Sequence, residues 1–505
     1  MQPYNHSAIY DIVIIGSGLG GLLCGYILSK EGYNVCIVEK NKKIGGCLQT
    51  FVRDGCVFDT GMHYIGSLEE GQILHRFFKY FDLTNRLKLK KLDEDGFDII
   101  NFKDKEYKYA QGYDNFINTL LQSFPDEKQG LVKYTDKLRE ISNSLNLYNL
   151  REVKSHNIIE NEYIVDSTMG FIRTVTSDTK LQNVLAGLNA LYAGKPDNTP
   201  LYIHAMINNF FIESAWRFID GSFQIAKFLA DSIINNGGTI LKNREAKKFI
   251  PDTRDNELKF VELSNSERIE SKYFISNVHP VRTLNMLEPD MMRKAYRNRI
   301  DSLENTISTF TVYIVLKKDT FRYLNYNYYY YATDNVWGVT SYSEKTWPEG
   351  YMLYTPATSR SDVYSDGIIV ITYMKYDEMK KWENTTVGKR GDDYIEFKKN
   401  KAEKLLDLVE RKFPGLRKKI KSYYTSTPLT YRDYTGTKEG STYGVFRDCN
   451  DPLISYIPPR TKIPNLFLTG QNVNLHGVLG VTIGSLLTCS ELLGLNYLIR
   501  KINDA

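Results

Sequence analysis

YDIVIIGSGLGG, residues 10–21, joins an apolar run typical of a buried parallel strand to a group of closely spaced glycines. Gly16, Gly18 and Gly21 have the spacing GxGxxG, and an apolar helical segment, LLCGYILSKEGY, follows them. Gly16 permits a tight turn, Gly18 lets the backbone approach a pyrophosphate, and Gly21 allows the helix to pack closely on the strand. The positive end of the helix dipole then faces the anion. The stretch therefore predicts a Rossmann-type unit that binds a dinucleotide.

The next apolar run, NVCIVEK, ends the predicted unit with Glu39 and Lys40. Glu39 stands 23 residues after Gly16, at the distance where an acid can bind the ribose hydroxyls of a dinucleotide. Its charge would repel a 2′-phosphate, so we expect the site not to hold NADP. A second glycine pair, Gly45 and Gly46, follows closely, and a plain NAD domain does not need it.

Length and charge narrow the class of protein. At 505 residues the chain is too long for one ordinary core, which predicts two domains. The 65 basic and 60 acidic residues leave a net charge of +5, which argues against dedicated nucleic-acid binding, although it could favour peripheral contact with an anionic membrane surface. The apolar residues 12–28 are interrupted by glycines and follow a segment without Lys or Arg, so we expect a cytoplasmic protein without a signal peptide or membrane anchor.

Cysteine, histidine and aromatic usage add three expectations. The six cysteines show no CxxC or zinc spacing and the seven histidines no HExxH, so we predict reduced thiols and no metal site. Thirty-seven Tyr and 24 Phe could build a hydrophobic pocket, although many of them must be ordinary core. The tyrosine-rich segment at 323–337 is interpreted as a strand of an aromatic-rich sheet; a loop that lines a substrate site or faces a membrane is the alternative.

Segments that complete the nucleotide domain are spread along the chain. Residues 223–243 predict an amphipathic helix and a strand, and three short segments up to residue 277 alternate like an antiparallel meander. The last 45 residues hold a buried strand, NLFLTG, and a long helix at 484–502. Helices over 113–215, and strands near 308–318 and 367–375, predict a second domain. We therefore predict an α/β fold in which a discontinuous dinucleotide-binding domain is interleaved with an α+β substrate domain, with the first at 1–85, 217–285 and 456–505 and the second at 86–216 and 286–455.

FDTGMHYIG, residues 58–66, places an adjacent His63–Tyr64 pair after the second glycine pair. With this stretch the chain resembles the phytoene-desaturase-like flavoproteins of the two-dinucleotide-binding superfamily, in particular their retinol saturase and carotenoid isomerase branch. Four further stretches carry the resemblance, so that it runs from the first strand to the last helix: PLYIHAMINNFFIESAW (200–216), ISNVHP (275–280), TPLTYRDYTGTKEGSTYG (427–444) and LTGQNVNLHGVLGVTIGSLL (468–487).

The resemblance implies that FAD is the cofactor and assigns residues to its parts. The ADP half would be held by Gly16, Ser17, Gly18, Leu19, Gly20, Gly21, Glu39, Lys40, Gly45 and Gly46. The backbone of Ala246 would meet the adenine. The pyrophosphate and isoalloxazine would meet Gly470, Gln471, Gly480, Val481 and Thr482, and the flavin ring would lie beside Gly61, Met62, His63 and Tyr64.

Two departures from the family pattern lie near the expected reaction face. Where saturases usually carry a proline and paired glycines, this chain has RFIDGS, which leaves only Gly221. The C-terminal segment carries NLHGVLG, with His476 in a stretch that varies between family members. The electron donor or the substrate could therefore differ from those of the family.

The implied activity is that of an FAD-dependent oxidoreductase acting on carbon–carbon double bonds of an apolar polyene or isoprenoid-like lipid. Saturation, desaturation and isomerisation are all open, and we favour reduction. Saturation needs a hydride and a proton, and His63, Tyr64 and His476 are the candidate proton donors. We expect His63 to hold the flavin rather than to move a proton. Because no second GxGxxG occurs, electrons would come from a transient donor such as NAD(P)H or from a separate reductase.

Two other functions stay open at this point. One is an amine-oxidase-type flavoenzyme, although the aromatic pair that often flanks the flavin in such enzymes is not identifiable in the sequence. The other is a flavin-free lipid-binding module of the same fold. The intact glycine set with Glu39 and the C-terminal TGQ argues against a lost cofactor.

Overall fold

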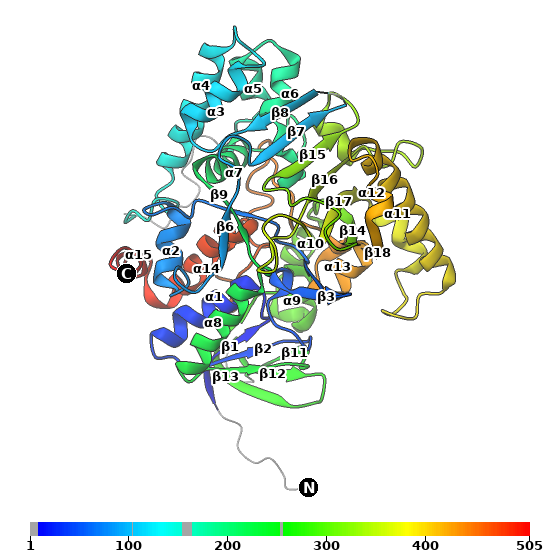
Figure 1. Cartoon of the computed structure of the whole chain (residues 1–505). Coiled ribbons are helices and arrows are strands. Elements are labelled where there is room, and N and C mark those ends of the chain that lie inside the picture. The colour runs from blue at the N-terminus through cyan, green and yellow to red at the C-terminus, as the bar shows by residue number, and fades with distance from the viewer. Residues whose placement is uncertain (1–8, 104, 154–163, 253–255) are drawn as a thin grey trace.

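The protein is described by a computed structural model that covers residues 9–103, 105–153, 164–252 and 256–505 (Figure 1). Two seven-stranded sheets organise these residues. The first sheet, at the bottom of Figure 1, draws its strands from the beginning, the middle and the end of the chain. The second sheet lies above it and draws its strands from the intervening segments. The predicted interleaving of two α/β units is therefore confirmed, while the residue boundaries of the two domains stay a prediction.

The first sheet has the order β10-β2-β1-β13-β12-β11, with β19 also paired to β13. Its parallel part is the predicted dinucleotide-binding unit, and β11 to β13 form the predicted meander. β1 is buried on both faces, as is usual in parallel sheets: Ile12 and Ile14 face helices α1, α8 and α14, and Val13 and Ile15 face the meander. The bounds are β1 (Tyr10–Ile15), α1 (Leu19–Lys30), β2 (Val35–Val38), α8 (Phe223–Asn235), β10 (Thr239–Leu241), β11 (Ala246–Pro251), β12 (Leu258–Leu263), β13 (Arg268–Ser276) and β19 (Leu466–Leu468).

The C-terminal helix differs from the prediction of one helix over 484–502. It begins earlier, as α14 (Gly477–Leu493), and a separate helix, α15 (Leu495–Asn503), follows. Gly494 separates them with a φ of 85°, a left-handed conformation that favours glycine and ends α14. The apolar pattern continues across this break, which is why it predicted a single helix.

The second sheet has the order β18-β14-β17-β16-β15-β7-β8. The tyrosine-rich segment forms its strand β15, so the favoured interpretation is confirmed. Alternate tyrosines of β15 face opposite sides: Tyr328 and Tyr330 pack on the side of helix α11, and Tyr329 and Tyr331 face the interior between the sheets. The bounds are β7 (Asp98–Phe102), β8 (Lys105–Tyr109), β14 (Ser308–Leu316), β15 (Asn327–Tyr331), β16 (Gly350–Tyr354), β17 (Gly367–Met374), β18 (Ile420–Ser426) and α11 (Asp392–Lys412).

Helices cover the remaining sides of the interior. The helix-rich segment predicted at 113–215 is confirmed, and its last helix, α7, turns one apolar face toward the space between the sheets. The helices outside the two sheets are α2 (Ile73–Tyr80), α3 (Tyr113–Leu121), α4 (Lys128–Ser144), α5 (Thr168–Val175), α6 (Thr179–Leu185), α7 (Leu201–Glu213), α9 (Pro280–Met286), α10 (Lys294–Ser302), α12 (Leu416–Lys419) and α13 (Pro428–Thr435), together with a 3-10 turn, η3 (Gly187–Leu191).

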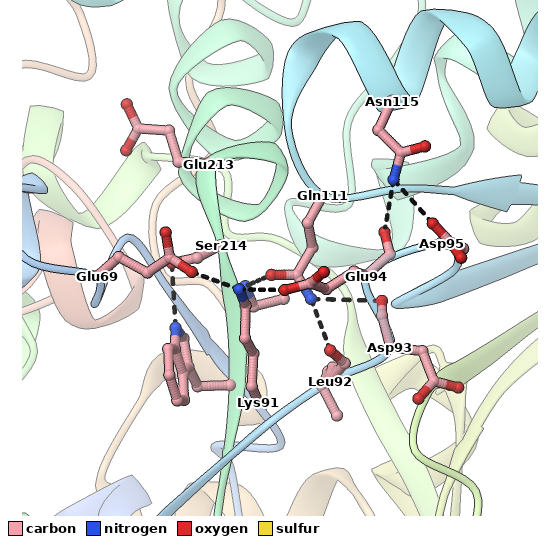
Figure 2. Close-up of polar contacts among 12 residues, drawn as sticks. Glu69, Lys91, Leu92, Asp93, Glu94, Asp95, Gln111, Asn115, Glu213 and Ser214 are labelled. Atoms are coloured by element: carbon pink, nitrogen blue, oxygen red, sulfur yellow. Dashed lines mark hydrogen bonds and ion pairs between the residues drawn. The ribbon is translucent and has the colours of Figure 1, made fainter.

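A small three-stranded sheet, β5 (Ile65–Gly66), β9 (Ala215–Phe218) and β6 (Leu89–Lys91), connects the two halves. Figure 2 shows the polar contacts at one end of it: Lys91 lies between Glu69 and Glu94, 2.6 Å from the latter, and Gln111 donates to the carbonyl of Leu92 at 2.7 Å. These ion pairs are partly exposed and contribute little energy, so they fix position more than stability. β9 then leads directly into the turn before α8 in the dinucleotide half.

Arg217 on β9 ties this connection to the second sheet. Its side chain is 2% exposed and donates five hydrogen bonds, to Tyr323, Leu324, Thr355, Tyr326 and Asn327. Three of the acceptors are backbone carbonyls, at 2.8 to 3.2 Å. A buried guanidinium therefore holds the loops around β15 and β16 against β9.

Candidate functional site

The glycine-rich turn after β1 has no room for side chains. A Cβ on Gly21 would lie 2.1 Å from the carbonyl oxygen of Gly16, so α1 packs directly on the turn. Gly16 itself has a φ of 94°. A Cβ on Gly20 would lie 2.6 Å from Oδ1 of Asn277. The turn is thus an open backbone cradle at the N-terminus of α1, as an anionic pyrophosphate needs.

Asn277 and Gly470 complete the cradle from two other strands. The amide of Asn277, which follows β13, donates to the carbonyl of Gly16 at 3.2 Å. Gly470, which follows β19, would place a Cβ 2.4 Å from Oδ1 of Asn277. Asn277 lies in the ISNVHP stretch, but no sequence pattern indicates that its side chain touches both glycine turns.

Glu39 lies at the end of β2 and orients the first turn. Its buried carboxylate accepts hydrogen bonds from the backbone N–H and hydroxyl of Ser17, at 3.0 and 2.6 Å, and from the N–H of Asn41 at 2.8 Å. Lys40 points away toward α13 and donates to the carbonyl of Asp433 at 2.6 Å. Glu39 is therefore fixed at the cavity wall by its neighbours.

One cavity of about 590 Å³ extends from this cradle to the second sheet. It is within the usual size of a cofactor or ligand site. Of the residues predicted from the sequence, those that line it are Gly16, Gly18, Leu19, Gly20, Glu39, Lys40, Gly45, Gly46, Gly61, Met62, His63, Tyr64, Ala246, Gln471, His476, Gly480 and Val481. Ser17, Gly21, Gly470 and Thr482 lie behind the wall.

Several buried polar atoms on the cavity wall have no hydrogen-bond partner among the described residues. They are Oδ1 of Asn472, Oδ1 of Asn474, Oγ of Ser441, and Oγ1 of Thr442 and Thr309. Buried polar groups are normally paired, so this part of the wall is built for a polar ligand. Together with the glycine cradle, these atoms fit a dinucleotide with a polar ring system.

His63 lies on the cavity wall after strand β4 (Cys56–Asp59). Its ring is 5.4 Å from that of Tyr354, and none of the described residues hydrogen-bonds to it. Burial, aided by the charge of Arg217, lowers the pKa of His63 to about 4. The imidazole is therefore neutral at physiological pH.

Asp59, which precedes His63 in FDTGMHYIG, has a structural task. It accepts hydrogen bonds from the N–H and hydroxyl of Ser222, at 2.8 and 2.6 Å. A Cβ on Gly221 would lie 2.5 Å from Cγ2 of Thr50. The RFIDGS turn, one of the departures from the family pattern, is thus built around a single glycine and this carboxylate.

Tyr64 connects the cavity to a buried carboxyl. Its ring stacks on Phe211 at 4.1 Å, and its hydroxyl lies 2.9 Å from Oδ2 of Asp98 and 3.1 Å from the hydroxyl of Tyr329. Asn327 donates to the other oxygen of Asp98 at 2.7 Å. Burial raises the pKa of Asp98 to about 7 and that of Tyr64 well above its ordinary value. The sequence missed Asp98 and Tyr329, which join Tyr64 only through the pairing of β7 with β15.

His476 and Tyr443 form a second aromatic element of the wall. Their ring centroids are 4.9 Å apart, and Nε2 of His476 lies 3.1 Å from the carbonyl of Leu191. Burial lowers the pKa of His476 to about 4, so it too is neutral. Tyr443 donates to the carbonyl of Ala190 at 2.7 Å. The sequence did not identify this aromatic pair because its members are 33 residues apart.

The remaining wall is apolar and aromatic. α7 contributes Ile203, Met206, Ile207, Phe210 and Phe211, and the second sheet contributes Tyr329, Tyr331, Met352, Ile371 and Tyr373. The hydroxyls of Tyr331 and Tyr373 donate to carbonyls of the segment 187–190, at 2.7 and 2.8 Å. The tyrosine-rich strand therefore both builds the sheet and lines the cavity.

Two further histidines, His204 and His279, are hydrogen-bonded away from the cavity. His204 lies between the hydroxyls of Tyr134 and Tyr192, at 2.8 and 3.0 Å. His279 caps α9 and lies 3.0 Å from Oδ1 of Asn305. No helix in the described part of the chain is long and apolar enough to cross a bilayer.

Comparison with known proteins agrees with this arrangement. A family described as an NAD(P)-binding Rossmann-like domain matches residues 14–81. The chain is 27% identical to the all-trans-retinol 13,14-reductase of Rattus norvegicus, over 96% of this chain and 86% of that protein. It is 24% identical to prolycopene isomerase 1 of an Oncidium hybrid cultivar, over 92% of this chain and 80% of that protein. The chain is a homologue of these enzymes.

Among solved structures, a putrescine oxidase bound to putrescine has a similar fold. It superposes with a TM-score of 0.64 at 14% identity, and the match covers 96% of this chain and 99% of that one. The two proteins therefore share this fold over nearly their whole length.

Proposed function

We propose that the protein is an FAD-dependent oxidoreductase that acts on carbon–carbon double bonds of an apolar polyene or isoprenoid-like lipid, with reduction favoured over desaturation and isomerisation. The observation that carries the proposal is the continuity of one cavity, because one wall is the glycine cradle and the other is the apolar face of α7 with the aromatic sheet. The retinol reductase and prolycopene isomerase homologues support the same chemistry.

The lining of the cavity by the predicted cofactor residues supports FAD as the ligand. The turns at Gly16–Gly21 and Gly45–Gly46 would hold the ADP half, and Glu39 would meet the ribose. The unpaired polar atoms of Ser441, Thr442, Asn472 and Asn474 would receive the polar edge of the flavin ring. When bound, FAD supplies the hydride transfer that these residues cannot provide themselves.

The chain's own residues then bind the lipid, exclude water and hold the proton. The apolar side chains of α7 offer the lipid a water-poor surface. Tyr64 and Tyr329 line the cavity and keep a proton at neutral pH, and Tyr64 is hydrogen-bonded to Asp98 behind it. His63 and His476 are neutral there, which supports a packing task rather than proton donation. Electrons would come from NAD(P)H or a reductase partner.

Purification gives the first test, because a yellow protein with flavin absorbance supports the cofactor assignment. The decisive experiment is anaerobic photoreduction of the flavin, followed by reoxidation with separate polyenes, retinoids and amines. Reoxidation by a polyene, with the saturated product detected by mass spectrometry, is the expected result. Reoxidation by amines alone, or a colourless protein that binds lipid, would overturn the proposal.

A further inference from the structure

An unpaired arginine lies on the cavity wall, away from the glycine cradle. Arg447 follows Tyr443 in the chain and lines the same cavity. Its two hydrogen bonds go to the backbone carbonyls of Ser455 and of Val473, the second at 2.6 Å. A guanidinium carries five N–H donors, so three remain without a partner among the described residues.

No carboxylate of the described residues forms an ion pair with Arg447. The titratable side chains that interact electrostatically with it are Tyr202 of α7 and His476, and neither supplies a negative charge at neutral pH. Burial accordingly lowers the pKa of Arg447, because its charge has lost water without gaining a counter-ion. Arg447 is partly exposed on the cavity wall, so a ligand in the cavity can reach its free N–H groups and supply the missing counter-ion.

The other cations on the cavity wall have a different setting. Lys40, Arg244, Lys247 and Arg282 lie at the dinucleotide end with Glu39 and Glu245. Lys247 pairs with Glu245 at 2.6 Å, and Arg282 donates to the carbonyl of Gly436 at 2.6 Å. Arg447 instead donates to the carbonyl of Val473, in the segment before α14, and to that of Ser455 in a loop. Among the described residues, none of the glycine cradle hydrogen-bonds to Arg447, so the pyrophosphate has a separate place to bind.

We infer that Arg447 binds an anionic head group of the substrate, and that the preferred substrate is a long unsaturated carboxylate rather than a neutral alcohol or hydrocarbon. The inference rests on the proposed function, since it concerns the same cavity. The cavity wall also includes Leu191, Ile203 and His476, so Arg447 shares the wall with apolar and neutral side chains. A guanidinium matches a carboxylate in two parallel hydrogen bonds. An apolar chain with one terminal carboxylate therefore satisfies both features.

The test is equilibrium binding to the purified full-length protein with the flavin it retains. All-trans-retinoic acid and all-trans-retinol share one polyene and differ in the head group, so the ratio of their dissociation constants isolates the carboxylate. We expect the acid to bind at least about tenfold more tightly than the alcohol. Arg447→Met should weaken acid binding by about 10- to 100-fold and alcohol binding by less than about threefold, as for loss of one partner of a buried charge pair. Arg447→Lys should fall between the two.

Arg299→Met is the matched control for the loop contact. Arg299 also donates to this loop, at the carbonyls of Ile454 and Tyr456, but it does not line the cavity. Arg299→Met should leave the ratio of the dissociation constants for the acid and the alcohol unchanged. If Arg447→Met does not fold, the inference is tested by the ratio of the two dissociation constants in the wild type and in Arg447→Lys.

Three results would overturn the inference. The first is equal binding of acid and alcohol by the wild type. The second is an equal loss for both ligands in Arg447→Met, which would make Arg447 a loop anchor only. The third is loss of flavin in Arg447→Met with an unchanged ratio in the remaining loaded protein, which would assign Arg447 to the cofactor phosphates. Because binding needs no turnover, failure of the polyene reoxidation experiment leaves this test intact, and the reverse also holds.

Discussion

The hydroxyl of Tyr64, on the cavity wall, lies 2.9 Å from a carboxyl oxygen of Asp98, which solvent does not reach. Asp98 is the only acid that the described structure hydrogen-bonds to Tyr64. Burial raises the pKa of this carboxyl from 3.8 to about 7, although the hydrogen bonds from Asn327 and Tyr64 and the charge of Arg217 oppose the shift. The site therefore contains a weak acid that changes protonation near physiological pH. This acid is hydrogen-bonded to Tyr64, whose side chain lines the cavity.

This arrangement predicts a specific pH dependence of stability. Between about pH 4 and pH 7 the folded protein binds a proton at Asp98 that the unfolded chain has released, so stability falls as pH rises through this window. Asp98→Asn should remove that contribution. We expect the melting temperature of the wild type to fall more between pH 5 and pH 8 than that of the variant. The exposed Asp136→Asn serves as the control, and identical slopes for Asp98→Asn and wild type would contradict the prediction.

Alanine substitutions at two helical glycines, Gly21 in the cradle and Gly484 in α14, should change stability in opposite directions. Gly21→Ala would press a methyl against the Gly16 carbonyl, 2.1 Å away, and should lower stability by about 1–3 kcal/mol or more and release the flavin. Gly484→Ala in α14 meets nothing within 4 Å and should raise stability by about 0.5–1 kcal/mol. Thermal unfolding and the flavin-to-protein absorbance ratio measure both effects. A flavin content that is normal in Gly21→Ala would argue against a pyrophosphate at this turn.

We expect removal of the Arg217 side chain, which lies outside both seven-stranded sheets, to lower the free energy of unfolding strongly. Arg217→Met would leave the backbone carbonyl of Thr355 and the side-chain carbonyl of Asn327 without this donor in a buried setting. At about 1–3 kcal/mol for each unsatisfied group, it should cost about 2–6 kcal/mol. Arg360→Met removes a half-exposed arginine that is ion-paired with Asp366, and should cost less than about 1 kcal/mol. Denaturant or thermal unfolding compares the two variants. Equal small losses would mean that water replaces Arg217 at these carbonyls.

The sequence predicted those features that depend on short spacing. GxGxxG, the acid at Glu39 and the second glycine pair lie within one local unit, so each glycine's task follows from its neighbours in the chain. Asp98, Arg217, Asn277 and Tyr329 could not be found this way, because their contacts cross between strands far apart in sequence. Asn277 meets Gly16 across 261 residues, and Tyr329 meets Tyr64 across 265. The split of α14 from α15 was missed because an apolar pattern does not report the left-handed conformation of Gly494.

His63 is predicted to affect cofactor retention more than chemistry. Its neutral ring lies on the cavity wall with Tyr354 beside it and without a hydrogen bond to any described residue. A pKa of about 4 leaves too little imidazolium at pH 7 for proton donation. His63→Ala should therefore raise flavin loss on dialysis by about tenfold, while turnover per bound flavin falls by less than about tenfold. The shape of the pH–rate profile between pH 5 and pH 9 should not change.

His75→Ala, on α2 and outside the cavity, is the matched control and should alter neither measurement. Full flavin content combined with a drop of about 100-fold or more in turnover would show that His63 takes part in proton transfer, since loss of a general acid or base has effects of that size. Full flavin content with full turnover would show that it matters to neither. The ratio of turnover to bound flavin thus separates a residue that holds the cofactor from one that moves a proton.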